Sequence, residues 1–133
     1  MIIVYAGDNN VAAGIPLERV LSDFQEFIRR VRETSTDTEV AMISMKPSPS
    51  RLAWLYDQQR ANALMFDYAR TQKKVSFLGI FTGFLGTMGS PKLEFFLADH
   101  LHLNETGYGV WKRVLGPYLD HVLQPLPPAP PQK

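Results

Sequence analysis

Asp99 and His102 are the residues whose types and spacing are best suited to acid–base chemistry. An ionised aspartate that accepts a hydrogen bond from one imidazole nitrogen fixes the tautomer and leaves the other nitrogen free to take a proton. The pair therefore predicts a general base, His102, oriented by Asp99. An ordinary capping or surface pair is the alternative. A metal site that includes His100 is disfavoured, because no further cluster of histidine or cysteine supplies the remaining ligands.

A second motif, Gly7-Asp8-Asn9-Asn10, directly follows an apolar run near the start of the chain. Glycine permits close approach of the backbone to a ligand, and an asparagine amide can donate a hydrogen bond to a developing oxyanion. The motif predicts an oxyanion site formed by Gly7 and Asn9. An Asx-type turn that caps the next element is the alternative.

The composition is typical of one soluble globular domain. Of the 133 residues, 45% are hydrophobic and 20% are charged, and the formal net charge is +1. Positive and negative residues are interleaved, so no basic patch favours nucleic acid. The absence of cysteine excludes disulfides and thiolate chemistry. We expect no cofactor, no nucleic acid and no membrane partner, and without a signal peptide a cytoplasmic location is the default expectation.

Alternating strand and helix patterns must position these motifs. Three apolar runs predict buried strands at residues 2–6, 39–45 and 75–80. Apolar residues at helical spacing predict helices at residues 16–33, 51–72 and 105–123. The apolar set of the second helix includes Leu52, Leu55, Ala63, Phe66 and Ala69. Asn104 is the expected N-cap of the third helix. Residues 1–124 are therefore expected to form one domain, followed by a Pro-rich disordered tail at 125–133.

This alternation predicts an α/β fold with a parallel sheet and right-handed crossovers. In such sheets, ligands bind beyond the carboxyl ends of the strands. The loops after the three strands should share that edge, and the loop at 99–102 can return to it.

Together the two motifs resemble the SGNH/GDSL hydrolase family, in which Gly-x-Asn-Asp follows the third strand and Asp-x-x-His precedes the last helix. Residues 5–10 resemble the former block and residues 99–108 the latter. The likeness extends through residues 46–49 and 60–62 and covers nearly the whole chain up to Leu119. The resemblance implies a three-layer α/β/α, flavodoxin-like fold whose first strands are missing from this chain.

The resemblance also implies an ester hydrolase of the esterase, lipase or acetylhydrolase type that acts on a small ester. In this family likeness, His102 is the base, Asp99 orients it and Asn9 donates to the oxyanion. Asn10 stands where the family usually has aspartate, which is expected to alter a loop hydrogen bond rather than the chemistry.

The serine block of the family, Gly-Asp-Ser, has no counterpart in this chain. Interpreting residues 7–9 as that block with serine replaced by asparagine is disfavoured, because too few strands separate it from His102. Ser48 and Ser90 are candidates for a substitute nucleophile, although ordinary turn roles are favoured for both. Direct activation of water by His102 is a further alternative.

The first strand also lacks the neighbour that the family sheet gives it. An unpaired apolar strand edge seeks a partner, so we expect a homo-oligomer that forms through residues 2–6. The alternative to a hydrolase is thus a non-catalytic, self-associating fragment or pseudoenzyme.

Overall fold

The computed structural model describes residues 1–125, within which three short strands form one parallel sheet. The strands are β1 (Ile2–Val4), β2 (Val40–Ile43) and β3 (Val75–Leu78), in the order β1-β2-β3. Val4 pairs with Met42, which pairs with Phe77, so the carboxyl ends of the strands reach one edge of the sheet. The predicted tail, residues 125–133, lies almost entirely outside the described residues.

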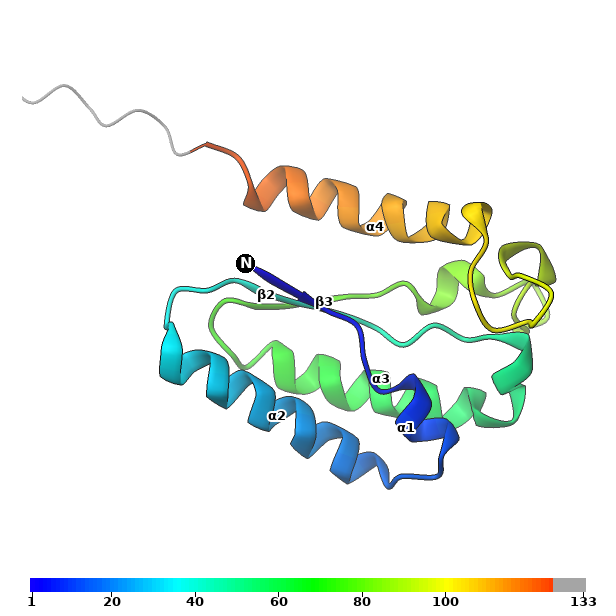
Figure 1. The fold of residues 1–133 in the computed structure, drawn as a ribbon, viewed down its shortest axis with the longest axis horizontal. Helices are drawn as coiled ribbons and strands as arrows, with labels where there is room; N and C mark the ends of the chain where they lie inside the picture. The colour runs from blue at the N-terminus through cyan, green and yellow to red at the C-terminus, as the bar shows by residue number, and fades with distance from the viewer. Residues whose placement is uncertain (126–133) are drawn as a thin grey trace, which may run out of the picture.

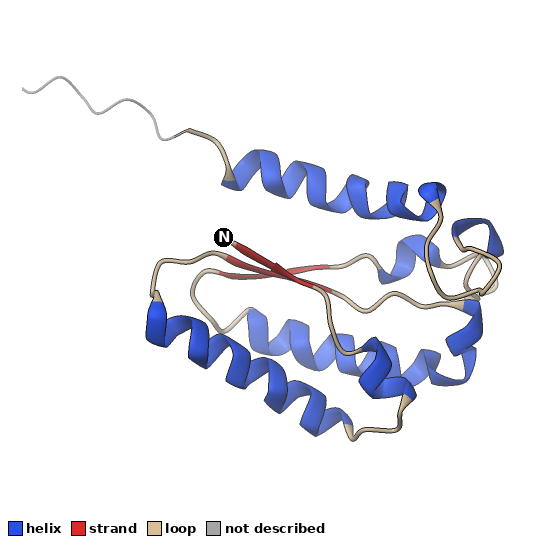
Figure 2. Cartoon of the chain, viewed as in Figure 1, coloured by secondary structure: helices blue, strands red, loops and turns tan. Residues whose placement is uncertain are grey.

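Helices cover both faces of the sheet and give the predicted three-layer α/β/α arrangement (Figures 1 and 2). The long helices α2 (Leu17–Thr34) and α3 (Leu55–Ala69) lie on one face, and α4 (Glu105–Val122) lies on the other. Shorter helices occupy the loops, namely α1 (Asp8–Ala12), η1 (Pro49–Trp54), η2 (Phe81–Phe84) and η3 (Leu93–Phe95). None of the described helices is long and apolar enough to cross a membrane.

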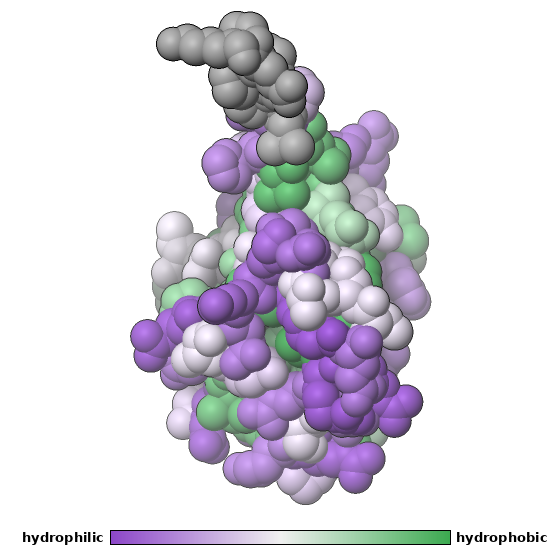
Figure 3. Space-filling view, turned by 90° about the vertical axis from the view of Figure 1, so that its left-hand side faces the viewer, coloured by the Kyte–Doolittle hydropathy of each residue, from purple (hydrophilic) through white to green (hydrophobic). Residues whose placement is uncertain are grey.

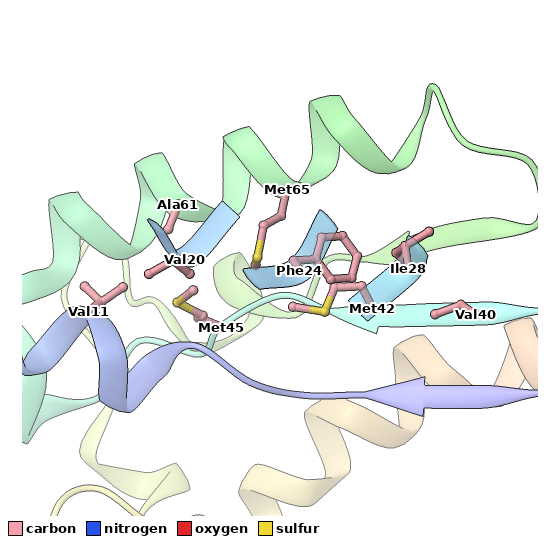
Figure 4. Close-up of a cluster of buried hydrophobic side chains, with 9 residues drawn as sticks. All are labelled: Val11, Val20, Phe24, Ile28, Val40, Met42, Met45, Ala61 and Met65. Carbon is pink, nitrogen blue, oxygen red and sulfur yellow. The ribbon is translucent and has the colours of Figure 1, made fainter. Parts of the chain in front are cut away.

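The side chains of β2 alternate between the two faces and so organise both halves of the core. Val40 and Met42 pack against residues of α2 and α3, in the cluster that Figure 4 shows. Ile43 packs on the other face with Phe84 and Val110. All four β2 residues are buried, as expected for the central strand of a parallel sheet that is covered on both sides. This burial explains why the strand appears in the sequence as a continuous apolar run.

Two of the predicted segments differ locally from the structure. The sequence predicts a loop directly after the first strand, whereas Asp8 begins the short helix α1. Gly7 turns the chain there with a φ of 105°, and an acidic residue in the first turn stabilises a helix N-terminus. The predicted helix at 51–72 is instead the 3₁₀ helix η1 followed by α3.

The buried face of α3 also differs from the predicted apolar set. Of that set, Leu52, Ala63 and Phe66 are exposed, whereas Leu55 is half-buried and Ala69 is buried. The buried positions of α3 include two polar residues, Gln58 and Asn62. The predicted set is therefore wrong at Leu52, Ala63 and Phe66 and confirmed at Ala69. Polar side chains with buried partners occupy positions of α3 that apolar periodicity cannot identify.

Arg32 connects two loops at the amino-terminal end of the sheet, opposite the carboxyl ends of the strands. Its guanidinium donates hydrogen bonds to the carbonyl oxygens of Thr38 and Lys73, each at 2.9 Å. The surface at this end is largely hydrophilic, with a smaller hydrophobic area toward the end of α4 (Figure 3). The predicted site residues lie at the opposite end of the sheet, beyond the carboxyl ends of the strands.

β1 is an edge strand, as the sequence predicts. Within the described residues it pairs only with β2, so the backbone groups along its outer side have no ladder partner there. Ile3 is 40% exposed, although Ile2 and Val4 pack against the core. The open edge is confirmed, whereas the oligomer expected from it stays a prediction.

Two glycines of α4 provide a matched test of how closely this helix packs against Phe95 and Leu103. A Cβ at Gly107 would overlap the carbonyl oxygen of Phe95 and lie 2.9 Å from Leu103 Cδ2, whereas a Cβ at Gly109 would meet nothing within 4 Å. We expect Gly107→Ala to lower the free energy of unfolding by about 1–3 kcal/mol through overpacking. Gly109→Ala should raise it by about 0.5–1 kcal/mol through helix propensity. Urea denaturation measures both, and a shift of the same sign in the two variants would contradict this packing.

Candidate active site

The carboxylate of Asp99 organises the loop that carries the predicted base. Its Oδ2 lies 2.5 Å from His102 Nδ1. Its Oδ1 accepts hydrogen bonds from the backbone N–H groups of Leu101 at 2.9 Å and of His102 at 3.0 Å. One carboxylate therefore fixes both the turn and the imidazole, so that only Nε2 of His102 remains for proton transfer.

The turn between these residues has a left-handed backbone at His100, with φ of 56°. For a residue with a side chain this conformation costs about 1–2 kcal/mol. Two hydrogen bonds secure it: His100 N–H donates to Leu97 O at 2.9 Å, and His100 O accepts from the N–H of Ser50 at 3.1 Å. The loop of His102 is thus attached to η1, a segment about fifty residues earlier in the chain.

Asn104 attaches the same loop to α4, as the sequence predicts. Its Oδ1 accepts a hydrogen bond from Gly107 N–H at 3.0 Å and so caps the helix. Its Nδ2 donates to the carbonyl oxygen of Glu94 at 2.8 Å. The segment that carries His102 is therefore fixed where it enters α4.

The Asp99–His102 pair lies at the surface. The side chain of His102 is 72% exposed and that of Asp99 is 47% exposed. The hydrogen bond from His102 holds the pKa of Asp99 well below its usual range, and the two backbone N–H groups act in the same direction. The carboxylate therefore remains ionised at any pH at which a neutral imidazole could act as a general base.

The conformation after β1 requires a glycine. Gly7 has a φ of 105°, and a Cβ there would lie 2.5 Å from Met45 Cε. Asp8 and Asn9 then form the first turn of α1. Asn9 is exposed, so its amide is placed near the surface at the carboxyl edge of the sheet.

A buried polar cluster lies under this turn and centres on Asp8. Asp8 Oδ1 accepts a hydrogen bond from Gln58 Nε2 at 2.7 Å. Two cations are near the same carboxylate: Lys46 Nζ is 3.6 Å from Oδ2, and Arg51 Nη1 is 3.8 Å from Oδ1. Burial lowers the pKa of Lys46, and the negative charge of Asp8 opposes that shift. Charge pairing thus offsets the desolvation of both groups.

Asn62 fixes the chain where it leaves β2. Its Oδ1 accepts from Met45 N–H at 2.8 Å, and its Nδ2 donates to Met45 O at 3.1 Å. A side-chain amide therefore satisfies both backbone groups of a buried residue that has left the sheet. This places the next residue, Lys46, in the polar cluster.

A pocket of about 450 Å³ joins the two predicted motifs. Gly7 and Asn9 form part of its wall, and His102 forms another part. The remaining lining residues are Tyr5, Ala6, Asp8, Asn10, Lys46, Leu101, Leu103, Tyr108 and Trp111. Trp111 packs against Tyr5 with ring centroids 5.1 Å apart, which gives the pocket an aromatic side.

The two serines named as substitute nucleophiles are placed elsewhere. Ser48 is fully buried and does not line the pocket, and its hydroxyl has no hydrogen-bond partner within the described residues. Ser90 is exposed in the turn after Gly86, where its carbonyl oxygen accepts from Gly86 N–H at 2.8 Å. This placement gives no support to a nucleophilic role for either residue. Within residues 1–125, no group of three His, Cys, Asp or Glu side chains could hold a metal ion.

The sequence alone assigns no role to Lys46, Arg51, Gln58, Asn62 or the carboxylate of Asp8. Lys46 and Asn62 lie within segments that carry the family likeness, but a likeness alone assigns them no contact. Gln58 and Asn62 are four residues apart and flank the buried Ala61. A polar pair on an otherwise buried helix face is the signal that could have indicated them.

No family model matches the sequence, and the search of curated proteins found no match. Solved structures do match. A protein from Streptococcus pneumonia provisionally described as a platelet activating factor superposes with a TM-score of 0.80 at 23% identity, over 88% of this chain and 58% of that chain. A GDSL-like lipase from Bacteroides thetaiotaomicron gives a TM-score of 0.78 at 17% identity, over 92% of this chain and 63% of the lipase.

A family 3 carbohydrate esterase from Clostridium thermocellum gives a TM-score of 0.64 at 17% identity, over 91% of this chain and 58% of the esterase. The chain therefore has the α/β fold of GDSL-like lipases and esterases, and it spans about 60% of the length of these structures. At these identities the similarity establishes the fold, and function must be argued from the site.

The Asp99 carboxyl provides a test of the site geometry by NMR. We expect its ¹³C carboxyl resonance to titrate well below the ordinary pKa of about 3.9. Because the folded-state pKa is lowered, the contribution of Asp99 to stability is present above about pH 3.9 and is lost as the pH falls through the folded value. In His102→Ala the pKa should rise only part of the way, since the backbone N–H groups of Leu101 and residue 102 still donate to Oδ1. An identical titration in the two proteins would contradict the contact.

Proposed function

We propose that this chain is an ester hydrolase in which His102 acts as general base. The observation that carries the proposal is that an imidazole oriented by Asp99 and the Gly7–Asn9 turn line one pocket at the carboxyl edge of the sheet. The fold shared with GDSL-like lipases and esterases supports the same class of reaction.

In this mechanism each group has a separate task. Asp99 holds Nδ1 of His102 and stabilises the imidazolium that forms when Nε2 takes a proton. The ester carbonyl develops negative charge on its oxygen as it is attacked, and the amide Nδ2 of Asn9 and the N–H of Gly7 donate to that oxygen. The imidazolium then returns the proton to the leaving alcohol.

Water is the proposed nucleophile in the chain as described. No serine or threonine lines the pocket within residues 1–125. The phenol of Tyr5 does line it, but burial raises the pKa of Tyr5 well above its usual value, so this hydroxyl stays protonated. Loss of the nucleophile from a catalytic triad costs on the order of a million-fold in turnover. We therefore expect slow hydrolysis, and only of esters with a good leaving group.

The shape of the pocket supports a small substrate. Its volume is about 450 Å³ and its aromatic side is formed by Tyr5, Tyr108 and Trp111. An acetyl or other short acyl ester fits these dimensions, and the aromatic wall suits an apolar alcohol group. No cofactor takes part in the proposed steps.

Hydrolysis of p-nitrophenyl acetate tests the proposal. We expect His102→Ala to lower the protein-catalysed rate by about 100-fold, because a positioned general base contributes at least that factor. His121→Ala is the matched control, since His121 is an exposed histidine in the last turn of α4, away from the pocket. Equal rates in wild type and His102→Ala would refute the role of His102. Labelling by a serine-directed phosphonate would point to a serine nucleophile instead of water.

We also propose that the chain associates with itself through β1, and this would be its function if it hydrolyses no ester. The supporting observation is that one apolar groove borders β1 and a second apolar groove lies on α4. One groove, of about 220 Å³, is lined by Val4, Phe24 and Phe27 among others. Another, on α4, is lined by Trp111, Leu115 and Leu119 among others. A second copy that pairs with β1 would cover the edge and the apolar groove that borders it.

Light scattering at micromolar concentration tests the association. We expect a dimer or larger species for the wild-type chain, and a shift to monomer for Ile3→Lys, because a lysine at an exposed edge strand opposes pairing. Met88→Lys is the control, since Met88 is 91% exposed in a loop outside both grooves. A wild-type chain that is monomeric would rule out self-association.

A further inference from the structure

Arg51 holds the Asp8–Asn9 turn, although it does not line the pocket itself. Its Nη2 donates a hydrogen bond to Asn9 Oδ1 at 2.9 Å, and its Nη1 donates to Asp8 O at 3.3 Å. We infer that Arg51 is a positioning residue that fixes the side-chain amide of Asn9 with Nδ2 directed away from the guanidinium. The inference deepens the proposed function, on which its catalytic meaning rests.

The chemistry of the two side chains determines this orientation. An arginine guanidinium has five N–H donors and no acceptor, so the atom of Asn9 that faces it must be the amide oxygen. An asparagine amide has one oxygen and one NH₂ group on opposite branches. With Oδ1 engaged by Arg51, the two N–H donors of Nδ2 are the groups of Asn9 left for a ligand in the pocket.

Arg51 is itself well supported. Its side chain is only 18% exposed, and Nη1 lies 3.8 Å from the buried carboxylate of Asp8. Its backbone N–H donates to Ser48 O at 3.0 Å within η1. The planar guanidinium therefore makes two directed contacts from a fixed base, which a flexible lysine cannot reproduce.

The same short segment also reaches the loop of the base. Ser50, the residue before Arg51, donates its N–H to His100 O at 3.1 Å. Two consecutive residues thus contact the Asn9 turn and the Asp99–His102 loop. This arrangement fixes the position of the oxyanion donor relative to the base, which a hydrolase requires in its active site.

NMR of the asparagine side chains tests the inference without relying on activity. In Arg51→Met we expect the Asn9 NH₂ signals to move toward those of Asn10, an exposed neighbour. The NH₂ signals of Asn62 should stay in place, because that amide bonds to Met45 and reports an intact fold. Arg113→Met, which removes an exposed arginine of α4, should change none of these signals. Unchanged Asn9 signals in Arg51→Met would overturn the inference.

A charge-retaining variant distinguishes positioning of the Asn9 amide from an effect of the positive charge alone. Arg51→Lys retains a positive charge near Asp8 but not the planar fork, so we expect the Asn9 NH₂ signals to move toward those of Asn10 in this variant as well. Wild-type Asn9 signals in that variant would show that charge alone is sufficient, and would overturn the inference. In ester hydrolysis, Arg51→Met should lower kcat by about 10- to 100-fold with little change in KM, somewhat less than removal of an oxyanion donor.

A double variant completes the design. Asn9→Ala combined with Arg51→Met should be no slower than Asn9→Ala alone, since Arg51 acts through Asn9. Additive losses would mean that Arg51 acts on the substrate directly, and would overturn the inference. Absence of hydrolysis in the wild-type chain would refute the proposed function, whereas the NMR comparison would still decide whether Arg51 positions Asn9.

Discussion

The buried carboxylate of Asp8 is the interaction on which the candidate site depends. Burying an unpaired charge in a protein interior costs several kcal/mol, so displacement of any partner of Asp8 would be unfavourable. They come from three different segments: Lys46 after β2, Arg51 in η1 and Gln58 in α3. Because Asp8 also begins α1, satisfying this one charge fixes the turn that carries Gly7 and Asn9 against the rest of the fold.

The second half of the site is anchored by another carboxylate that acts locally. Asp99 shapes its own turn through two backbone N–H groups and orients His102 with its remaining oxygen. This turn would be free to move relative to Asn9 if it were held only by its neighbours in sequence. The hydrogen bond between Ser50 and His100, next to the Arg51 contacts, links the two carboxylate-centred turns.

The separation in sequence between contacting residues explains which parts of the fold and site could be predicted from the sequence. The Asp99–His102 pair is a contact over three residues, and β2 is an apolar run buried on both faces, so local patterns reveal both. The contacts of Gln58 and Arg51 with the Asp8–Asn9 turn join residues more than forty positions apart. Periodicity treats polar residues as exposed, so it misses Gln58 on the buried face of α3 and includes Ala63 and Phe66, which are exposed.

The open edge of β1, where self-association is proposed, lies next to the pocket in which ester hydrolysis is proposed. Neighbouring parallel strands end at the same edge of a sheet, and β1 ends directly before Gly7 and the pocket. Any strand that pairs in parallel with β1 would therefore place its following residues close to the pocket that His102 lines. A hydroxyl in such a segment would meet a base already oriented by Asp99. Under the two proposals, pairing at β1 and the chemistry of His102 would therefore be connected through the topology of the sheet.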